Sequence, residues 1–158
     1  MTNALKYLGL ILILSIIGFL IRDYFFDFSL SQIAYEKTQI VNRTMSGQFY
    51  SHILFALSIG IIPLLYLIIR KITKLNFITQ GLISCAIIVI SGISLWQFRI
   101  FQLNSRIQKL SEFDIGNGIK TELNFDSLNF GRYLFIGFLI GTVLSILIFK
   151  NRNKTVTE

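Results

Sequence analysis

Residues 53–98 read ILFALSIGIIPLLYLII (53–69), RKITK (70–74) and LNFITQGLISCAIIVISGISLWQF (75–98), so two long apolar runs flank a five-residue basic turn. Each run approaches the ~20 residues that an α-helix needs to cross the hydrocarbon core of a bilayer. Two further apolar runs, residues 4–22 and 133–149, bring the number to four. The sequence therefore predicts an all-α membrane protein whose four transmembrane helices pack as a bundle.

The composition of the 158-residue chain excludes several other classes of protein. With 53% hydrophobic residues and a mean hydropathy of +0.66, the chain is too apolar for an ordinary soluble domain. The first apolar run resembles the core of a signal peptide, but it continues into Arg22 and Asp23 without a cleavage site of small residues, so we expect it to be retained. One cysteine, Cys85, and one histidine, His52, predict no disulfide, metal or cofactor site.

Charge is divided unevenly between the segments that join the apolar runs. Residues 1–6, 70–74 and 150–158 hold seven Lys/Arg and one acid, whereas residues 22–51 and 97–132 hold eight Lys/Arg and seven acids. Short loops rich in Lys/Arg stay in the cytoplasm, so we expect both termini there. The basic turn would then be a cytoplasmic anchor formed by Arg70, Lys71 and Lys74. A solvated anchor explains these charges without a nucleic-acid partner, and the expected partner is the lipid bilayer.

The two longer segments are predicted to carry short helices on the outer face of the membrane. A break is expected near residues 27–30, where Ser29 and Gln32 have capping-box spacing, and this predicts a helix over residues 31–45. Residues 100–110 continue helically, and the glycine-rich run at 114–118 ends that helix. Residues 119–125 then alternate between apolar and polar side chains, which predicts either one short strand or an extended cover; a strand would need a partner strand from elsewhere in the chain or from another subunit.

Small residues in the second and fourth runs indicate helix packing and a weak internal repeat. Moving the second run by 81 positions aligns its small residues with those of the fourth, which suggests one four-span domain built from two halves, 4–72 and 75–152. Chance similarity between apolar helices is the alternative. Small residues four apart let helix backbones approach closely in lipid. The candidate packing residues are Ala56, Gly60, Gly137, Gly141 and Ser145.

The third run has the most polar stripe, and the second run has the only proline of the chain. At 100° per residue the polar side chains fall within ~80° of each other. They would line a narrow pore if several copies turned them inward, although interhelical hydrogen bonding is the commoner role. The residues of this stripe are Gln80, Ser84, Ser91 and Ser94. Pro63 should kink its helix, either as an architectural feature or as a hinge of a gate.

In length, topology and outer aspartates the chain resembles lipoprotein signal peptidases, which are four-span aspartyl proteases. The last span of that family opens with F-N-x-A-D, and residues 124–127 (NFDS) are similar with one residue missing. Its other catalytic aspartate lies in an N-x-x-D-R motif after the third span, where residues 117–120 (NGIK) carry no acid. The resemblance implies an outer-face enzyme that would use Asp126 with Asp23 or Asp27.

The function that the sequence favours is non-enzymatic. No apolar run has a charge in its centre, which argues against an internal relay for ions or protons. We expect a small oligomerising subunit, with itself or in a larger complex, of pore type or accessory type. The aspartyl enzyme and an immunity-type protein against a membrane-active toxin remain alternatives. An excess of isoleucine over alanine, 28 against 4, suggests an AT-rich genome and hence a bacterial inner membrane.

Overall fold

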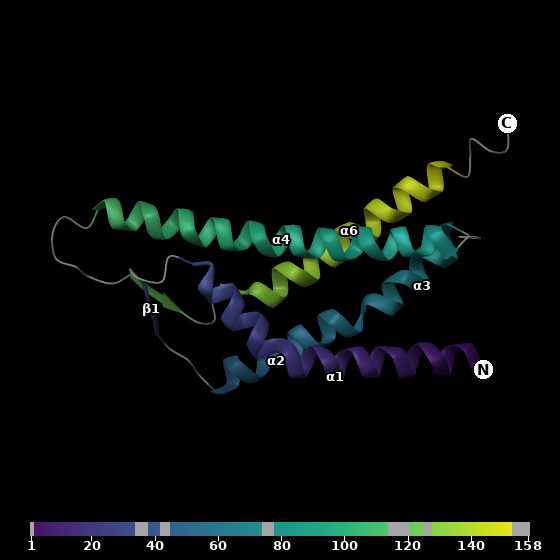
Figure 1. The fold of residues 1–158 in the computed structure, drawn as a ribbon, viewed down its shortest axis with the longest axis horizontal. Coiled ribbons are helices and arrows are strands. Elements are labelled where there is room, and N and C mark those ends of the chain that lie inside the picture. Colours follow the sequence, from purple (N-terminus) through teal and green to yellow (C-terminus); the bar gives the residue numbers. More distant parts are fainter. Residues whose placement is uncertain are drawn as a thin grey trace.

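The computed structural model describes residues 2–33, 38–41, 45–73, 78–113, 121–124 and 128–152. Apart from two four-residue strands, these residues are almost entirely helical (Figure 1). In chain order the elements are α1 (Thr2–Ser31), β1 (Thr38–Val41), α2 (Met45–Gly60), α3 (Ile62–Thr73), α4 (Ile78–Phe113), β2 (Thr121–Asn124) and α6 (Phe130–Arg152).

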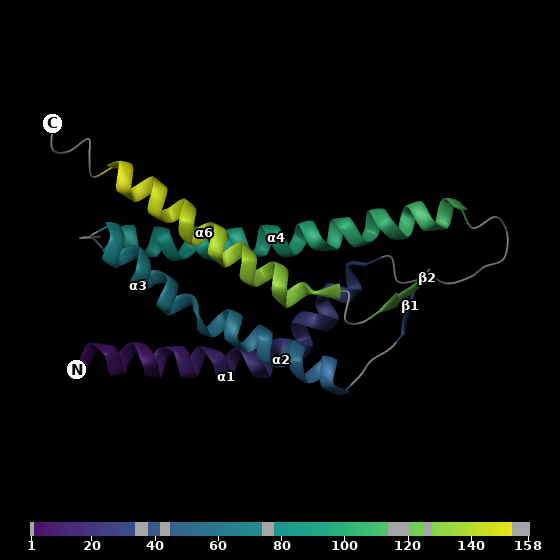
Figure 2. The ribbon, with the colours of Figure 1, turned by 180° about the vertical axis from the view of Figure 1, so that it is seen from behind.

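Among the described residues, four helical segments are long and apolar enough to cross a membrane, which confirms the four predicted helices by length and composition and fits an integral membrane protein. They are Leu5–Ser31, Ser46–Thr73, Ile78–Lys109 and Phe130–Lys150. The chain runs back and forth along the long axis of the molecule (Figure 1). Seen from behind in Figure 2, the start of α1, the end of α3, the start of α4 and the end of α6 all lie at one end, and the two strands lie toward the other.

The first helix does not break where the sequence suggested. α1 continues through residues 27–30 to Ser31, and its last third packs against α4. Ser29, expected to begin a new helix, is fully buried inside α1, where its hydroxyl donates to the Phe25 carbonyl at 2.7 Å and accepts the Trp96 indole N–H at 3.0 Å. The contact with α4 therefore keeps the helix intact beyond its apolar run.

The predicted helix over residues 31–45 is wrong, because β1 occupies Thr38–Val41. An extended chain covers ~3.3 Å per residue, whereas a helix covers ~1.5 Å per residue. A strand therefore needs fewer residues than a helix to span the distance from the end of α1 to the start of α2. The predicted strand within 119–125 is present as β2, and its partner is β1. The two strands pair in parallel, with Thr38 opposite Thr121 and Val41 opposite Asn124. Each strand connects the two spans of its own half, so equivalent segments meet, although the duplication itself stays a prediction.

The second outer helix is not a separate element. Residues 100–110 form the outer part of α4, which is 36 residues long and ends at Phe113. At 1.5 Å per residue α4 measures ~54 Å, well beyond the ~30 Å hydrocarbon core. Its outer part is amphipathic as predicted, since Ile100, Leu103 and Ile107 are buried and Arg106 is exposed.

The second span is interrupted at Ile61, between α2 and α3. Pro63 is buried near the start of α3 and has no backbone N–H to donate to the preceding turn. The backbone bonds on either side are kept: Ile61 N–H reaches the Leu57 carbonyl at 2.9 Å, and Leu65 N–H reaches the Ile61 carbonyl at 3.0 Å. The interruption thus follows from the proline ring, as the sequence predicted.

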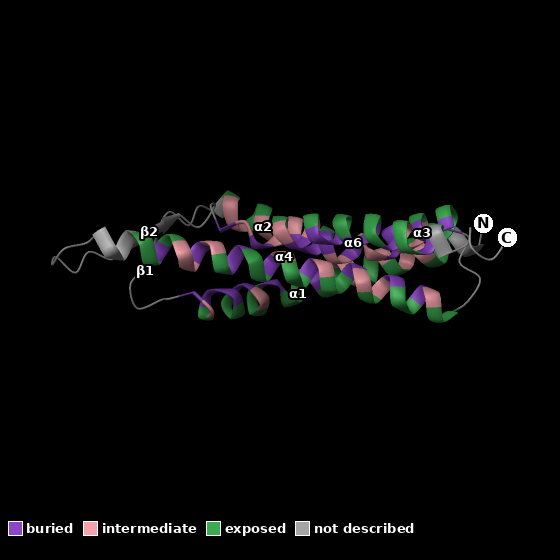
Figure 3. Ribbon diagram, turned by 90° about the horizontal axis from the view of Figure 1, so that it is seen from above, coloured by how far each residue is buried: buried purple, intermediate pink, exposed green. Residues whose placement is uncertain are grey.

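Aromatic side chains concentrate in the core toward the strand end of the molecule. The ring of Phe25 lies 4.6 Å from that of Phe55 and 5.1 Å from that of Trp96, between ring centroids. Phe26 meets Phe130 edge-on at 5.6 Å. Along the spans, by contrast, the outward faces of the helices are exposed and apolar, as expected where lipid is the solvent (Figure 3).

Candidate functional site

The small residues of the second span contact α1 of the same chain. Ala56 is buried, and its Cα lies 3.1 Å from the position that a Cβ on Gly18 would take. A Cβ on Gly60 would collide with the Ser15 hydroxyl and lie 3.2 Å from the Ile11 carbonyl oxygen. This face of α2 is therefore already covered by α1 and is not open to another subunit.

The small residues of the fourth span contact α4 in the same way. A Cβ on Gly137 would lie 2.6 Å from the Cα of Gly92, and one on Gly141 would lie 2.7 Å from the Cα of Ile88. Ser145 is fully buried, and its hydroxyl donates to the Ser84 carbonyl at 3.4 Å. Close backbone approach between α4 and α6 thus occurs inside one chain.

The polar stripe on α4 is divided between two environments. Ser84 is fully buried, and its hydroxyl donates to the Gln80 carbonyl at 2.9 Å on its own helix. The Ser91 carbonyl faces α6 at Gly137, whereas Ser94 is exposed. A serine hydroxyl that donates a hydrogen bond to a carbonyl of its own helix needs no water molecule as a partner. Ser84 and Ser91 therefore face a neighbouring helix, and the four residues do not share one surface.

The basic turn lies at the end of the molecule where α1 begins. Arg70 and Lys71 are exposed in the last turn of α3, and Lys74 lies outside the described residues. The Arg70 guanidinium reaches the Tyr7 hydroxyl at 3.4 Å, which ties α3 to the first turns of α1.

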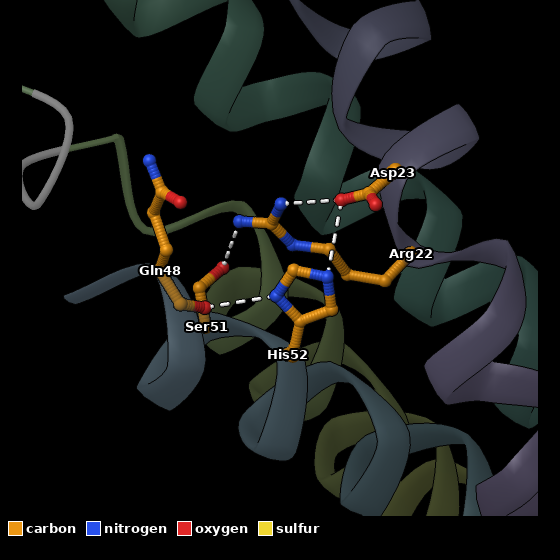
Figure 4. A network of polar contacts seen from close by, with 5 residues as sticks. All are labelled: Arg22, Asp23, Gln48, Ser51 and His52. Carbon is orange, nitrogen blue, oxygen red and sulfur yellow. Dashed lines mark hydrogen bonds and ion pairs between the residues drawn. The ribbon is translucent and has the colours of Figure 1, made fainter. Parts of the chain in front are cut away.

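A cluster of polar side chains joins α1 to α2 near the opposite end of the spans (Figure 4). Arg22, which is 6% exposed, donates to the Asp23 carboxylate at 2.8 Å and to the Ser51 hydroxyl at 2.8 Å. His52 Nε2 lies 3.1 Å from the same carboxylate oxygen, and its Nδ1 lies 2.9 Å from the Gln48 carbonyl. Asp23 is thus held between two basic side chains.

A second arginine-centred cluster joins α4 to α6. Arg99 is also 6% exposed; its Nε donates to the Leu128 carbonyl at 3.0 Å, and its guanidinium lies 5.1 Å from the centre of the Tyr133 ring. The Tyr133 hydroxyl and Arg99 both reach the Gln102 side-chain oxygen, at 3.3 and 3.4 Å. Each of the two buried arginines, Arg22 and Arg99, therefore lies in the part of its helix nearer the strands and contacts residues near the start of the next span along the chain.

A cavity of about 370 Å³ lies between α1, the start of α2 and the start of α6. Two arginines, hydroxyl and amide side chains, and apolar rings share its wall. The lining residues are Arg22, Phe25, Phe26, Ser46, Gly47, Tyr50, Ser51, Leu54, Phe55, Asn129, Phe130, Gly131 and Arg132. None of these described lining residues is acidic, and the volume of the cavity is in the range of small-molecule sites, ~300–1,000 Å³. Among the described residues this is the place where polar groups, charge and open space coincide.

The backbone at Asn129 sets the entry to α6 beside this cavity. Asn129 has φ of 54°, a left-handed conformation that asparagine tolerates better than most residues. Its carbonyl accepts the N–H groups of Arg132 and Tyr133 at 3.0 and 3.2 Å. The turn therefore starts α6 with the Arg132 guanidinium 5.6 Å from the centre of the Tyr50 ring.

Of the three aspartates that the resemblance to lipoprotein signal peptidases implies, the structure describes Asp23 and Asp27. Asp126 lies outside the described residues. Asp23 is engaged by Arg22 and His52, and Asp27 is exposed on α1. An aspartyl dyad needs two carboxyl groups that share a proton, whereas Asp23 shares its oxygen with basic groups. No group of three or more His, Cys, Asp or Glu suited to a metal occurs among the described residues.

Sequence reasoning did not find the cavity. Arg22 and Arg132 were assigned to the balanced charge of the outer segments, because each simply adjoins the end of an apolar run. The distance of each arginine from the far end of its span was a signal that could have placed the two side by side. At 1.5 Å per residue Arg22 lies ~26 Å along α1 from Leu5, and Arg132 lies ~27 Å along α6 from Lys150, which puts both at one level.

Comparison of the chain with protein-family models, with curated protein sequences and with solved structures found no match in any of the three.

Proposed function

We propose that this protein is a small non-enzymatic subunit of a bacterial inner membrane that assembles with copies of itself. Both termini and the basic turn lie on the cytoplasmic side in this proposal, because Lys/Arg-rich short segments are retained there. The arginine clusters and the two strands then lie at the outer face. The four spans form one helical bundle per chain.

The observation that carries the proposal is the uncovered face of α1. Only 11% of the most apolar window of this span is buried, against 22–39% for the other three. On the side away from α2, five residues fall within ~80° at 100° per residue. They are Leu5, Gly9, Leu12, Ile16 and Leu20.

The exposure of this face and the open space at Gly9 support packing against a second membrane helix. Its leucines and isoleucine are 55–73% exposed, and no atom lies within 4 Å of a Cβ built on Gly9. A glycine flanked by large apolar side chains admits a neighbouring backbone, and van der Waals packing of this kind drives helix association in lipid. Association through α1 replaces the expected association through Ala56, Gly60, Gly137, Gly141 and Ser145, since those residues pack within the chain.

Native mass spectrometry of the gently extracted protein tests the proposal by counting copies. Leu12→Trp places a bulky ring on the proposed face, and Leu147→Trp is its matched control, because both leucines are 55% exposed on apolar helices. We expect a wild-type oligomer that Leu12→Trp reduces to single chains and that Leu147→Trp leaves intact. A wild-type protein found only as single chains, or equal effects of the two variants, would contradict the proposal.

A further inference from the structure

We infer that the cavity between α1, α2 and α6 binds the phosphate-bearing headgroup of an anionic phospholipid. The inference is independent of the oligomeric state, because all the described lining residues belong to one chain and lie on α1, on α2 or at the start of α6. It rests on three features of that wall: its charge, its apolar rings and its level along the spans.

The charge of the wall suits an anion. Arg22 and Arg132 line the cavity together with Tyr50 and Ser51, and no carboxylate is among the described residues that line it. Asp23 offsets the charge of Arg22 from outside the wall. Arg132 makes no ion pair with any of the described acidic residues, and its guanidinium is exposed beside the Tyr50 ring. A planar guanidinium offers several N–H donors to phosphate oxygens, so Arg132 provides the charge that a phosphate would neutralise.

The apolar part of the wall favours a lipid over free phosphate. Phe25, Phe26, Leu54, Phe55 and Phe130 line the same cavity as the polar groups. A hydrated inorganic anion gains nothing from five apolar side chains, whereas the glycerol backbone and the first acyl carbons of a phospholipid bury apolar surface against them. The wall therefore matches an amphiphile, with one charged end and one apolar end.

The level of the cavity matches the position of a headgroup. Arg22 and Arg132 lie ~26–27 Å along their helices from the opposite ends of the spans, close to the ~30 Å thickness of the hydrocarbon core. Arginine at this depth lies level with the phosphates of the interface, which stabilise its guanidinium. A phospholipid whose phosphate is in the cavity would leave its acyl chains along α1 and α6.

The test measures lipid retention by native mass spectrometry after reconstitution with phosphatidylglycerol or with phosphatidylcholine. Arg132→Gln removes the exposed guanidinium of the cavity, Arg132→Lys keeps the charge, and Arg106→Gln is the matched control, because Arg106 is exposed on the outer part of α4 away from the cavity. A separate sample receives inorganic phosphate in place of lipid. Helix content of each variant is checked by circular dichroism.

We expect one phosphatidylglycerol per wild-type chain, with retention about fivefold lower in Arg132→Gln, nearly unchanged in Arg132→Lys and unchanged in Arg106→Gln. Retention of phosphatidylcholine equal to that of phosphatidylglycerol would overturn the inference, because the site would then not discriminate between lipids by their net charge. Equal losses in Arg132→Gln and Arg106→Gln would overturn it as well, since general surface charge would then explain the binding. An inorganic phosphate adduct that excludes lipid would assign the cavity to a free anion and refute the lipid ligand.

Discussion

Replacement of Gly137 by alanine should separate α4 from α6. A Cβ at position 137 would lie 2.6 Å from both the Gly92 Cα and the Ser91 carbonyl oxygen. Because these are backbone atoms, no side-chain rotation relieves the contact. Favourable contacts between carbon atoms are ~3.5–4.0 Å, so the two helices must move apart by about 1 Å at this point.

The free energy of unfolding should fall by about 1–3 kcal/mol, the usual loss when a methyl group is forced into a packed core. Alanine is also the better helix former, by up to ~1 kcal/mol, which offsets part of that loss. On single chains dispersed in detergent, where no second copy covers α1, Gly9→Ala isolates the propensity effect, because a Cβ there meets nothing within 4 Å. The difference between the two variants therefore reports the steric cost alone.

Unfolding in mixed micelles with increasing sodium dodecyl sulfate, followed by circular dichroism, measures both variants against the wild type. Gly137→Ala should unfold at a lower detergent fraction, and Gly9→Ala at or above the wild-type value. If Gly137→Ala is as stable as Gly9→Ala, then α4 and α6 do not approach through Gly137 and Gly92, and the packing derived from the small residues is refuted.

Two further substitutions can be read in the same unfolding assay. Asp23→Asn leaves the Arg22 guanidinium nearly buried without its carboxylate, and should cost about 1 kcal/mol, a modest value because the Asp23 side chain is 68% exposed to screening solvent. Asp27→Asn, at an exposed position of the same helix, should change the free energy of unfolding little. Equal effects of Asp23→Asn and Asp27→Asn would show that the contact of Asp23 with Arg22 does not stabilise the fold. Trp96→Phe deletes the indole N–H that reaches Ser29 at 3.0 Å, and should lower the free energy of unfolding by about 1 kcal/mol; no change would mean that this bond does not hold the last third of α1 to α4.

Hydropathy and residue spacing were sufficient to predict the regular elements that depend on local pattern. The four spans, the interruption beside Pro63, the outward continuation of α4 and the strand within 119–125 all follow from neighbouring residues in the chain. The break expected at residues 27–30 was wrong for a reason that lies elsewhere in the sequence. Trp96 and the last third of α4 contact the C-terminal part of α1, and such tertiary contacts outweigh the local helix propensity.

The candidate site was beyond local reasoning because it joins three helices distant in sequence. Arg22, Ser51 and Arg132 each adjoin an apolar run and look like ordinary interface residues when taken singly. Their convergence on one cavity depends on which faces of α1, α2 and α6 meet. The small residues were recognised as packing residues, but their partners were unknown until the structure placed them on α1 and α4.

Membrane residence and helix number thus follow from the amino-acid sequence alone, because transfer of an apolar run into lipid depends on the run and not on its neighbours. The choice of helix partners, the parallel pairing of β1 with β2 and the position of the arginines around the cavity depend on the tertiary structure. In lipid the hydrophobic effect does not distinguish one apolar face from another, so close van der Waals fit and buried polar contacts decide how the helices meet.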